Sequence, residues 1–236
     1  MTLMLTRNDR PRRPLAVVFS DNSTGPADGD DTAALAAMLA AAEGWRFEVA
    51  TAGPNGEMTV QAALQRPDLR LYAQPGASGD DEQAFRRQRA DKAAIRRYVH
   101  GGGRYLGVCM GAFLAEPGFF NLFPGRVGEY YSSKGATVTS ADPALVLIHW
   151  RGQPRLMYFQ DGGYMVPKRK APGVQVLARY PNGSIAAMVT RSGNGKVALC
   201  GPHPEAPPEW FHTEELAYTG PTQDLGDDLV ATLMAP

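Results

Sequence analysis

The chain has 236 residues, which is enough for one large domain or two small ones with a buried core. Its 24 basic and 24 acidic residues give a formal charge of zero, which argues against nucleic acid or an anionic membrane surface as the main partner. Two cysteines cannot form a disulfide framework, and no apolar run has the length of a signal peptide or a membrane span. We therefore expect a soluble protein in a reducing, cytoplasmic setting.

The first half of the chain alternates apolar runs with helical patterns. Residues 7–14 are polar and interrupted by proline, and we expect residues 1–14 to form a mobile tail. Four strands are predicted at residues 15–19, 47–51, 69–73 and 105–108, with helices at residues 31–43, 60–64 and 83–100. This alternation predicts a mostly parallel central sheet with helices on both faces, and ligands bind such sheets at the carboxyl ends of the strands.

The second half of the chain is rich in strands. Asn182-Gly183 and Asn194-Gly195 indicate hairpin turns, so an antiparallel β extension of the parallel sheet is expected. The predicted strands cover residues 145–150, 156–160, 174–180, 184–190 and 196–200, and residues 225–234 form a closing helix. No linker or repeat divides the chain, so residues 15–236 are predicted to form a single domain.

Cys109 lies at the junction of the fourth strand and a short helix, between Gly107 and Gly111. A cysteine in an apolar run is more often a small core residue than a nucleophile. Here the flanking glycines match a nucleophile elbow, a strained turn that needs neighbours without bulk and that places the side chain above a helix N-terminus. The positive end of the helix dipole favours a thiolate. Cys200 lacks this setting and is interpreted as a buried structural residue.

A cysteine nucleophile needs a base, and the base needs a partner that fixes its tautomer. His203 and Glu205 follow the last predicted strand in a loop that contains two prolines. In an extended loop, residues two apart point to the same side, so both can face one site. His100, His149 and His212 show no metal-ligand spacing and are interpreted as structural.

The segments Gly107-Val-Cys-Met-Gly111 and Gly201-Pro-His-Pro-Glu205 together resemble the class I glutamine amidotransferase-like superfamily. Within it, the chain is most similar to the family named after the N-terminal domain of certain biotin-protein ligases. Residues 95–115 resemble that family's central signature, and residues 158–164 its aromatic-then-diglycine segment. The resemblance implies a flavodoxin-like, class I amidotransferase-like fold.

By this resemblance Cys109 is the nucleophile, His203 the base and Glu205 the orienting acid. The family usually has Pro-Gly-Gly where this chain has Pro75-Gly76-Ala77, and alanine resists a positive φ far more than glycine does. No cofactor and no metal are implied. The residues implied to hold the oxyanion or the substrate are Gly76, Ala77, Met110, Gly162 and Gly163.

The expected function is that of a cysteine-dependent amidohydrolase or amidotransferase-like enzyme that forms a thioester on Cys109. Its substrate would be a small-molecule amide or acyl compound, with a separate synthetase or acceptor protein as a further partner. Two alternatives remain open: peptidase-like or other acyl transfer on the same triad, and a non-catalytic binding or regulatory protein that keeps the fold. The run at residues 28–31 is interpreted as a loop and helix cap rather than a metal site, and residues 168–170 as an exposed basic loop that could reach the mouth of the site.

Overall fold

The computed structural model describes residues 13–23 and 30–236, so the predicted tail lies outside the described residues except for Arg13 and Pro14. Residues 28 and 29 of the acidic run at residues 28–31 lie outside them too. The strands are β1 (Leu15–Phe19), β2 (Glu48–Ala52), β3 (Leu69–Gln74), β4 (Arg104–Val108), β5 (Gly125–Glu129), β6 (Ala144–Trp150), β7 (Gln153–Phe159), β8 (Gly163–Pro167), β9 (Gln175–Arg179), β10 (Ile185–Ser192) and β11 (Gly195–Cys200). The helices are α1 (Asp31–Ala41), α2 (Val60–Leu64), α3 (Asp81–Gln88), the 3-10 turn η1 (Arg89–Asp91), α4 (Lys92–His100), α5 (Met110–Phe113), α6 (Pro208–Thr213) and α7 (Gln223–Met234).

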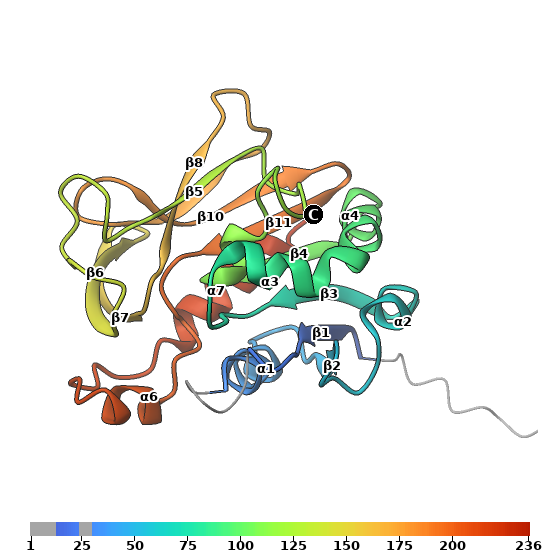
Figure 1. Ribbon diagram of the computed structural model, residues 1–236, viewed down its shortest axis with the longest axis horizontal. Helices are drawn as coiled ribbons and strands as arrows, with labels where there is room; N and C mark the ends of the chain where they lie inside the picture. The colour runs from blue at the N-terminus through green and yellow to red at the C-terminus, as the bar shows by residue number, and fades with distance from the viewer. Residues whose placement is uncertain (1–12, 24–29) are drawn as a thin grey trace, which may run out of the picture.

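One sheet joins these strands in the order β2-β1-β3-β4-β11-β10-β9-β6-β7, with β8 paired to β10 and β5 paired to β8. The first five strands of this order are parallel, and β10 begins the antiparallel part. In Figure 1, β1 and β2 lie at the bottom of the view and the β6–β7 hairpin lies at its left, in keeping with their places near the two ends of the sheet order. The predicted α/β class, with a mostly parallel sheet and an antiparallel extension, is confirmed.

Helices cover both faces of the parallel strands, because side chains alternate between the faces along each strand. On β1, Ala16 and Val18 join the core beneath α1 and α7, while Leu15 and Val17 join the core beneath α2, α4 and α5. Both sets are fully buried. Full burial of a leucine side chain contributes about 2 kcal/mol. Leu229 and Leu233 of α7 are fully buried too. The C-terminal helix is therefore an integral part of the core that contains Ala16 and Val18.

The pairing of β4 with β11 brings together the two segments that carry the predicted chemistry. Val108 lies opposite Cys200 in the parallel register, and the Cys109 amide donates to the Cys200 carbonyl over 2.9 Å. The elbow and the loop that contains His203 therefore leave neighbouring strands at the same edge of the sheet. This is the carboxyl edge, where parallel α/β sheets bind ligands.

Three local expectations differ from the structure. The helix predicted over residues 83–100 is divided into α3 and α4 by η1. From the sequence we expect Asp31 or Thr32 to cap the first helix, but Asp30 caps α1, since its carboxylate accepts the Ala33 amide. Strands β5 and β8 were not predicted, because glycine begins both and proline ends β8, and both residues are unfavourable in strands. In the described ranges, no helix is long and apolar enough to cross a membrane.

Candidate active site

The junction of β4 and α5 has the strained geometry expected of an elbow. Cys109 adopts φ 49° and ψ −111°, a conformation that L-residues rarely adopt. A Cβ on Gly107 would collide with the Gly111 carbonyl, and a Cβ on Gly111 would collide with the Gln74 carbonyl of β3. Both glycines therefore allow close approach of backbone to backbone, as the sequence predicts. The thiol is almost buried and donates a hydrogen bond to the Gln160 carbonyl at 3.4 Å.

The predicted oxyanion donors line the same pocket as Cys109. Met110 begins α5, where first-turn amides have no acceptor within the helix. Gly76 and Ala77 follow β3, and neither has a positive φ, so alanine at position 77 causes no backbone strain. Gly76 is required for space, since a Cβ there would lie 2.5 Å from Asp31 Oδ1 and 3.1 Å from His203 Cε1.

His203 and Glu205 form a buried pair behind the pocket. Nδ1 of His203 and Oε1 of Glu205 are 2.9 Å apart, and both side chains are almost fully removed from solvent. The edges of Tyr158 and Trp210 hold the ring, with centroids 5.8 and 5.4 Å from that of His203. Within the described residues, neither His203 Nε2 nor Glu205 Oε2 has a hydrogen-bond partner of good geometry.

The electrostatics of this pair favour a charged imidazole. Burial on its own lowers the pKa of His203, but the Glu205 carboxylate and Cys109 together raise it well above its usual range. Cys109 is thus close enough for its charge and hydrogen bonding to act on the ring. Hydrogen bonds between catalytic groups are often poorly aligned before substrate binds, which accounts for the unpartnered Nε2.

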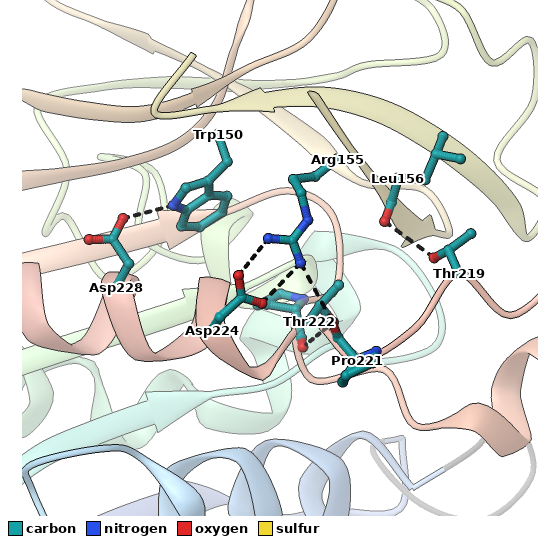
Figure 2. Close-up of polar contacts among 9 residues, drawn as sticks. Trp150, Arg155, Leu156, Thr219, Pro221, Thr222, Asp224 and Asp228 are labelled. Carbon is teal, nitrogen blue, oxygen red and sulfur yellow. Dashed lines mark hydrogen bonds and ion pairs between the residues drawn. The ribbon is translucent and has the colours of Figure 1, made fainter. Parts of the chain in front are cut away.

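The loop between these two side chains is fixed from behind by α7. Thr222 Oγ1 donates to the Pro204 carbonyl at 2.8 Å, a buried contact between His203 and Glu205 in the chain. Figure 2 shows how α7 also holds the β6–β7 hairpin: Arg155 pairs with Asp224, and the Trp150 indole donates to Asp228 at 2.7 Å. The loop therefore rests on a packed helix, and it is also joined to β7 by the His203 amide, which donates to the Tyr158 carbonyl.

A pocket of about 360 Å³ opens at this edge of the sheet and has room for a small metabolite. Five of the predicted site residues line it: Gly76, Ala77, Cys109, Met110 and His203. Glu205 lies behind His203 and is outside the lining. The other residues that line the pocket are Asp31, Ser78, Gly79, Phe113, Ala141, Asp142, Pro143, Gln160 and Asp161.

Gly162 and Gly163 were expected to hold the oxyanion or the substrate, but neither residue lines the pocket. Both are buried, and side chains there would collide with Gly201 and Val127 respectively. The diglycine thus lets the segment before β8 approach the loop after β11. As a result, the two residues before it, Gln160 and Asp161, line the pocket instead.

Asp31 and Asp161 line the pocket but are not among the site residues that the sequence predicts. Asp31 was considered only as a helix cap, although it follows the loop after β1 and so belongs to the carboxyl edge of the sheet. Asp161 directly precedes the diglycine, so the sequence pattern that singled out Gly162 and Gly163 could also have indicated Asp161. Trp210 gave none, since the sequence alone does not show that α6 folds back on His203. The basic run 168–170 does not line the pocket, and the Lys168 amide donates to Pro124 instead.

Cys200 is fully buried beneath the site, and burial raises the pKa of its thiol well above the usual value. Its Sγ donates to the Pro202 carbonyl at 3.2 Å, so it acts as a small core residue that supports the loop before His203.

One group of described residues has the spacing of a metal site. Single ligand atoms of Asp31, His203 and Glu205 lie within 4.8 Å of one another. The hydrogen bond between His203 and Glu205 already uses one atom from each. An ion there would have to bind the two remaining atoms, His203 Nε2 and Glu205 Oε2, and that ring nitrogen would then not be available to Cys109.

The sheet order defines an α/β protein with a mostly parallel sheet, and the pocket lies at the carboxyl edge of that sheet. Residues 121–232 match the family described as "Biotin-protein ligase, N terminal". This match confirms the resemblance that the sequence indicated, over a segment that contains His203 and Glu205 but begins after Cys109.

Two solved structures share the fold over nearly their whole length. PurLQS from Thermotoga maritima superposes with a TM-score of 0.61 at 16% identity, covering 94% of this chain and 98% of that chain. A glutamine amidotransferase from Thermotoga maritima gives a TM-score of 0.59 at 9% identity, covering 95% and 100%. A protein of Chlamydia muridarum described as uncharacterized is 27% identical over 190 residues, which is 72% of this chain and 73% of its own.

Proposed function

We propose that this protein is a cysteine-dependent amidohydrolase or amidotransferase-like enzyme in which Cys109 attacks an amide or related acyl group. The observation that carries the proposal is the pairing of β4 with β11, which delivers a strained cysteine and a buried histidine–glutamate pair to one pocket. A nucleophile, a base and an orienting acid are the parts that acyl transfer through a covalent intermediate requires.

In this mechanism the Cys109 thiolate attacks the carbonyl carbon, and the carbonyl π electrons move onto oxygen. The amide of Met110, with that of Gly76 or Ala77, stabilises the oxyanion, supported by the N-terminus of α5. His203 then donates its proton to the leaving amine as the C–N bond breaks and the thioester forms. Water, deprotonated by His203, hydrolyses the thioester and restores the thiolate. Glu205 keeps the ring oriented and stabilises its charged form.

If the released ammonia is transferred rather than lost to solution, a separate synthetase or acceptor protein would receive it. We place this reaction in a reducing compartment such as the cytoplasm, because both cysteines are free thiols and the nucleophile must remain reduced.

The test is ammonia release from a panel of small amides, together with intact-mass detection of a thioester that hydroxylamine removes. The proposal expects both signals in the wild type and in Cys200→Ala, and neither in Cys109→Ala. Release of a larger amine instead of ammonia would indicate peptidase-like chemistry on the same triad. Failure to detect any acyl adduct across the panel, with Cys109 no more reactive than a free thiol, would favour the non-catalytic alternative.

A further inference from the structure

Helix α5 follows Cys109 directly and consists of a single turn, Met110–Phe113. A helix this short is marginal unless other contacts hold it, and among the described residues no side chain caps its first turn. Its hydrogen bonding also stops early. The Ala115 amide, which would continue the helix by donating to the Gly111 carbonyl, donates to the Ala112 carbonyl instead. The Gly111 carbonyl therefore needs a donor from outside the helix.

Tyr105 of β4 supplies that donor. Its hydroxyl donates to the Gly111 carbonyl at 2.7 Å, and the side chain is fully buried. Burial raises the pKa of Tyr105 well above its usual range, so the phenol keeps its proton and remains a donor. Tyr105 and Gly107 are two residues apart and face the same side of β4. Glycine at position 107 leaves the space that the Gly111 carbonyl occupies, since a Cβ there would collide with it.

The ring of Tyr105 is itself held in place. Tyr72 of β3 packs against it with ring centroids 6.2 Å apart, and Phe120 meets it edge-on at 6.3 Å. All three side chains are fully buried, so the hydroxyl has a fixed position against α5. Tyr105 does not line the pocket, and its influence on a reaction there has to pass through the Gly111 carbonyl.

Two separate anchors fix the two sides of the elbow. The Cys109 amide donates to the Cys200 carbonyl at 2.9 Å, which ties the nucleophile to β11. The segment that follows, with the Met110 amide at its start, is tied to β4 by the bond from Tyr105 to Gly111. Loss of the second anchor should therefore disturb the Met110 amide more than the sulfur of Cys109.

We propose that Tyr105 is a positioning residue of this site, which holds the Met110 amide where the oxyanion of the tetrahedral intermediate forms. This inference rests on the proposed function, since an oxyanion arises only if Cys109 attacks a carbonyl group. Oxyanion stabilisation depends on donors that are fixed before the reaction begins, and displacing one of them weakens it. A hydrogen bond outside the pocket lining thus contributes to the reaction inside the pocket.

The first test compares two reagents for Cys109 that differ in their need for an oxyanion site. Butyraldehyde adds reversibly: the C–S bond forms, the carbonyl π electrons move onto oxygen, and that oxygen lies against the oxyanion donors and accepts the His203 proton. Iodoacetamide alkylates the same sulfur with loss of iodide and forms no oxyanion. Protection of Cys109 from iodoacetamide by increasing butyraldehyde therefore gives the dissociation constant of the aldehyde.

In Tyr105→Phe we expect this dissociation constant to rise at least about tenfold, while the alkylation rate without aldehyde stays close to that of the wild type. In ammonia release, kcat should fall by a similar factor and KM should not change, because Tyr105 lies outside the pocket lining. A general loss of structure would lower the alkylation rate in parallel with the aldehyde affinity, and that result would overturn the assignment.

Tyr180→Phe is the matched control, because it also removes a buried hydroxyl that donates to a glycine carbonyl, that of Gly163 at 2.9 Å. It should lower the urea midpoint of unfolding about as much as Tyr105→Phe does and leave the aldehyde constant unchanged. 4-Aminophenylalanine at position 105 keeps an N–H donor at the end of the ring, so it should restore most of the aldehyde affinity. This variant also provides the test if Tyr105→Phe does not fold.

Equal aldehyde constants in the wild type and Tyr105→Phe would overturn the inference and leave the proposed function standing. An equal loss of affinity in Tyr180→Phe would do the same, as would a folded 4-aminophenylalanine variant that binds the aldehyde at least about tenfold more weakly than the wild type. A wild-type Cys109 that is alkylated no faster than a free thiol and is not protected by the aldehyde would overturn the proposed function itself.

Discussion

At the scale of single residues, the site is defined as much by the absence of side chains as by their presence. Gly76 lies where any Cβ would press on both Asp31 and His203. Burial raises the pKa of Asp161 to about 6, so this residue carries an ionised group in a setting that disfavours ionisation. Ionisation of Asp161 therefore lowers the stability of the folded protein.

Gly76→Ala should lower kcat/KM by about a hundredfold, because displacing the His203 ring or the β3–α3 loop by even a fraction of an ångström misplaces the base. Steady-state kinetics with the best amide substrate measures this. Gly118→Ala is the matched control, since a Cβ there meets no atom within 4 Å and the backbone is not left-handed. Equal losses in the two variants would contradict the assigned role of Gly76.

Asp161→Asn should stabilise the protein at neutral pH. The raised pKa means that the unfolded carboxylate loses its proton near pH 4 and the folded one only near pH 6, so this group lowers the unfolding free energy as pH rises through that window. The variant should unfold at a higher temperature than the wild type at about pH 7, and the difference should vanish at about pH 4. Thermal unfolding measured at both pH values checks this. A difference that persists at low pH would attribute the effect to packing instead.

At the scale of elements, the histidine loop depends on α7. Thr222 supplies the hydrogen bond that fixes the Pro204 carbonyl, and the salt bridge of Arg155 with Asp224 keeps the β6–β7 hairpin against the same helix (Figure 2). Helix α7 therefore helps to place His203, although the histidine belongs to a loop that comes earlier in the chain.

Thr222→Val removes this bond without changing the size of the side chain. We expect a loss of about 1–3 kcal/mol in unfolding free energy, because the buried Pro204 carbonyl is left without that donor. Urea titration measures the loss. Thr219→Val, whose hydroxyl makes only an exposed 3.4 Å contact with Leu156, should change stability by less than about 0.5 kcal/mol. If both variants behave alike, the loop does not depend on α7 in this way.

The elements also show where sequence reasoning succeeds. Helix α2 and strand β1 have the predicted boundaries, because an apolar run or a threonine cap marks them. The division of the 83–100 segment into α3 and α4 carries no proline or glycine signal, so it follows from tertiary packing. Strands β5 and β8 escaped prediction because glycine begins both and proline ends β8, so local propensity argues against a strand in either segment.

At the scale of the whole molecule, the alternation of the first half was enough to predict a parallel sheet and the edge at which ligands bind. The position of β11 next to β4 could not be read from local patterns, because about ninety residues separate the two strands and their pairing depends on the full sheet order.

The proposed reaction depends on Cys109 and His203 acting as one unit across the β4–β11 pair. The most direct measurement is the rate of Cys109 alkylation by iodoacetamide at about pH 6, followed by peptide mass mapping, in the wild type, His203→Gln and Glu205→Gln. Because the raised pKa of His203 keeps the ring charged there, Cys109 should react at least about tenfold faster than a free cysteine thiol, which is mostly protonated at that pH. Both variants should lose most of this advantage. A wild-type rate equal to that of a free thiol, or rates unchanged in both variants, would contradict the account.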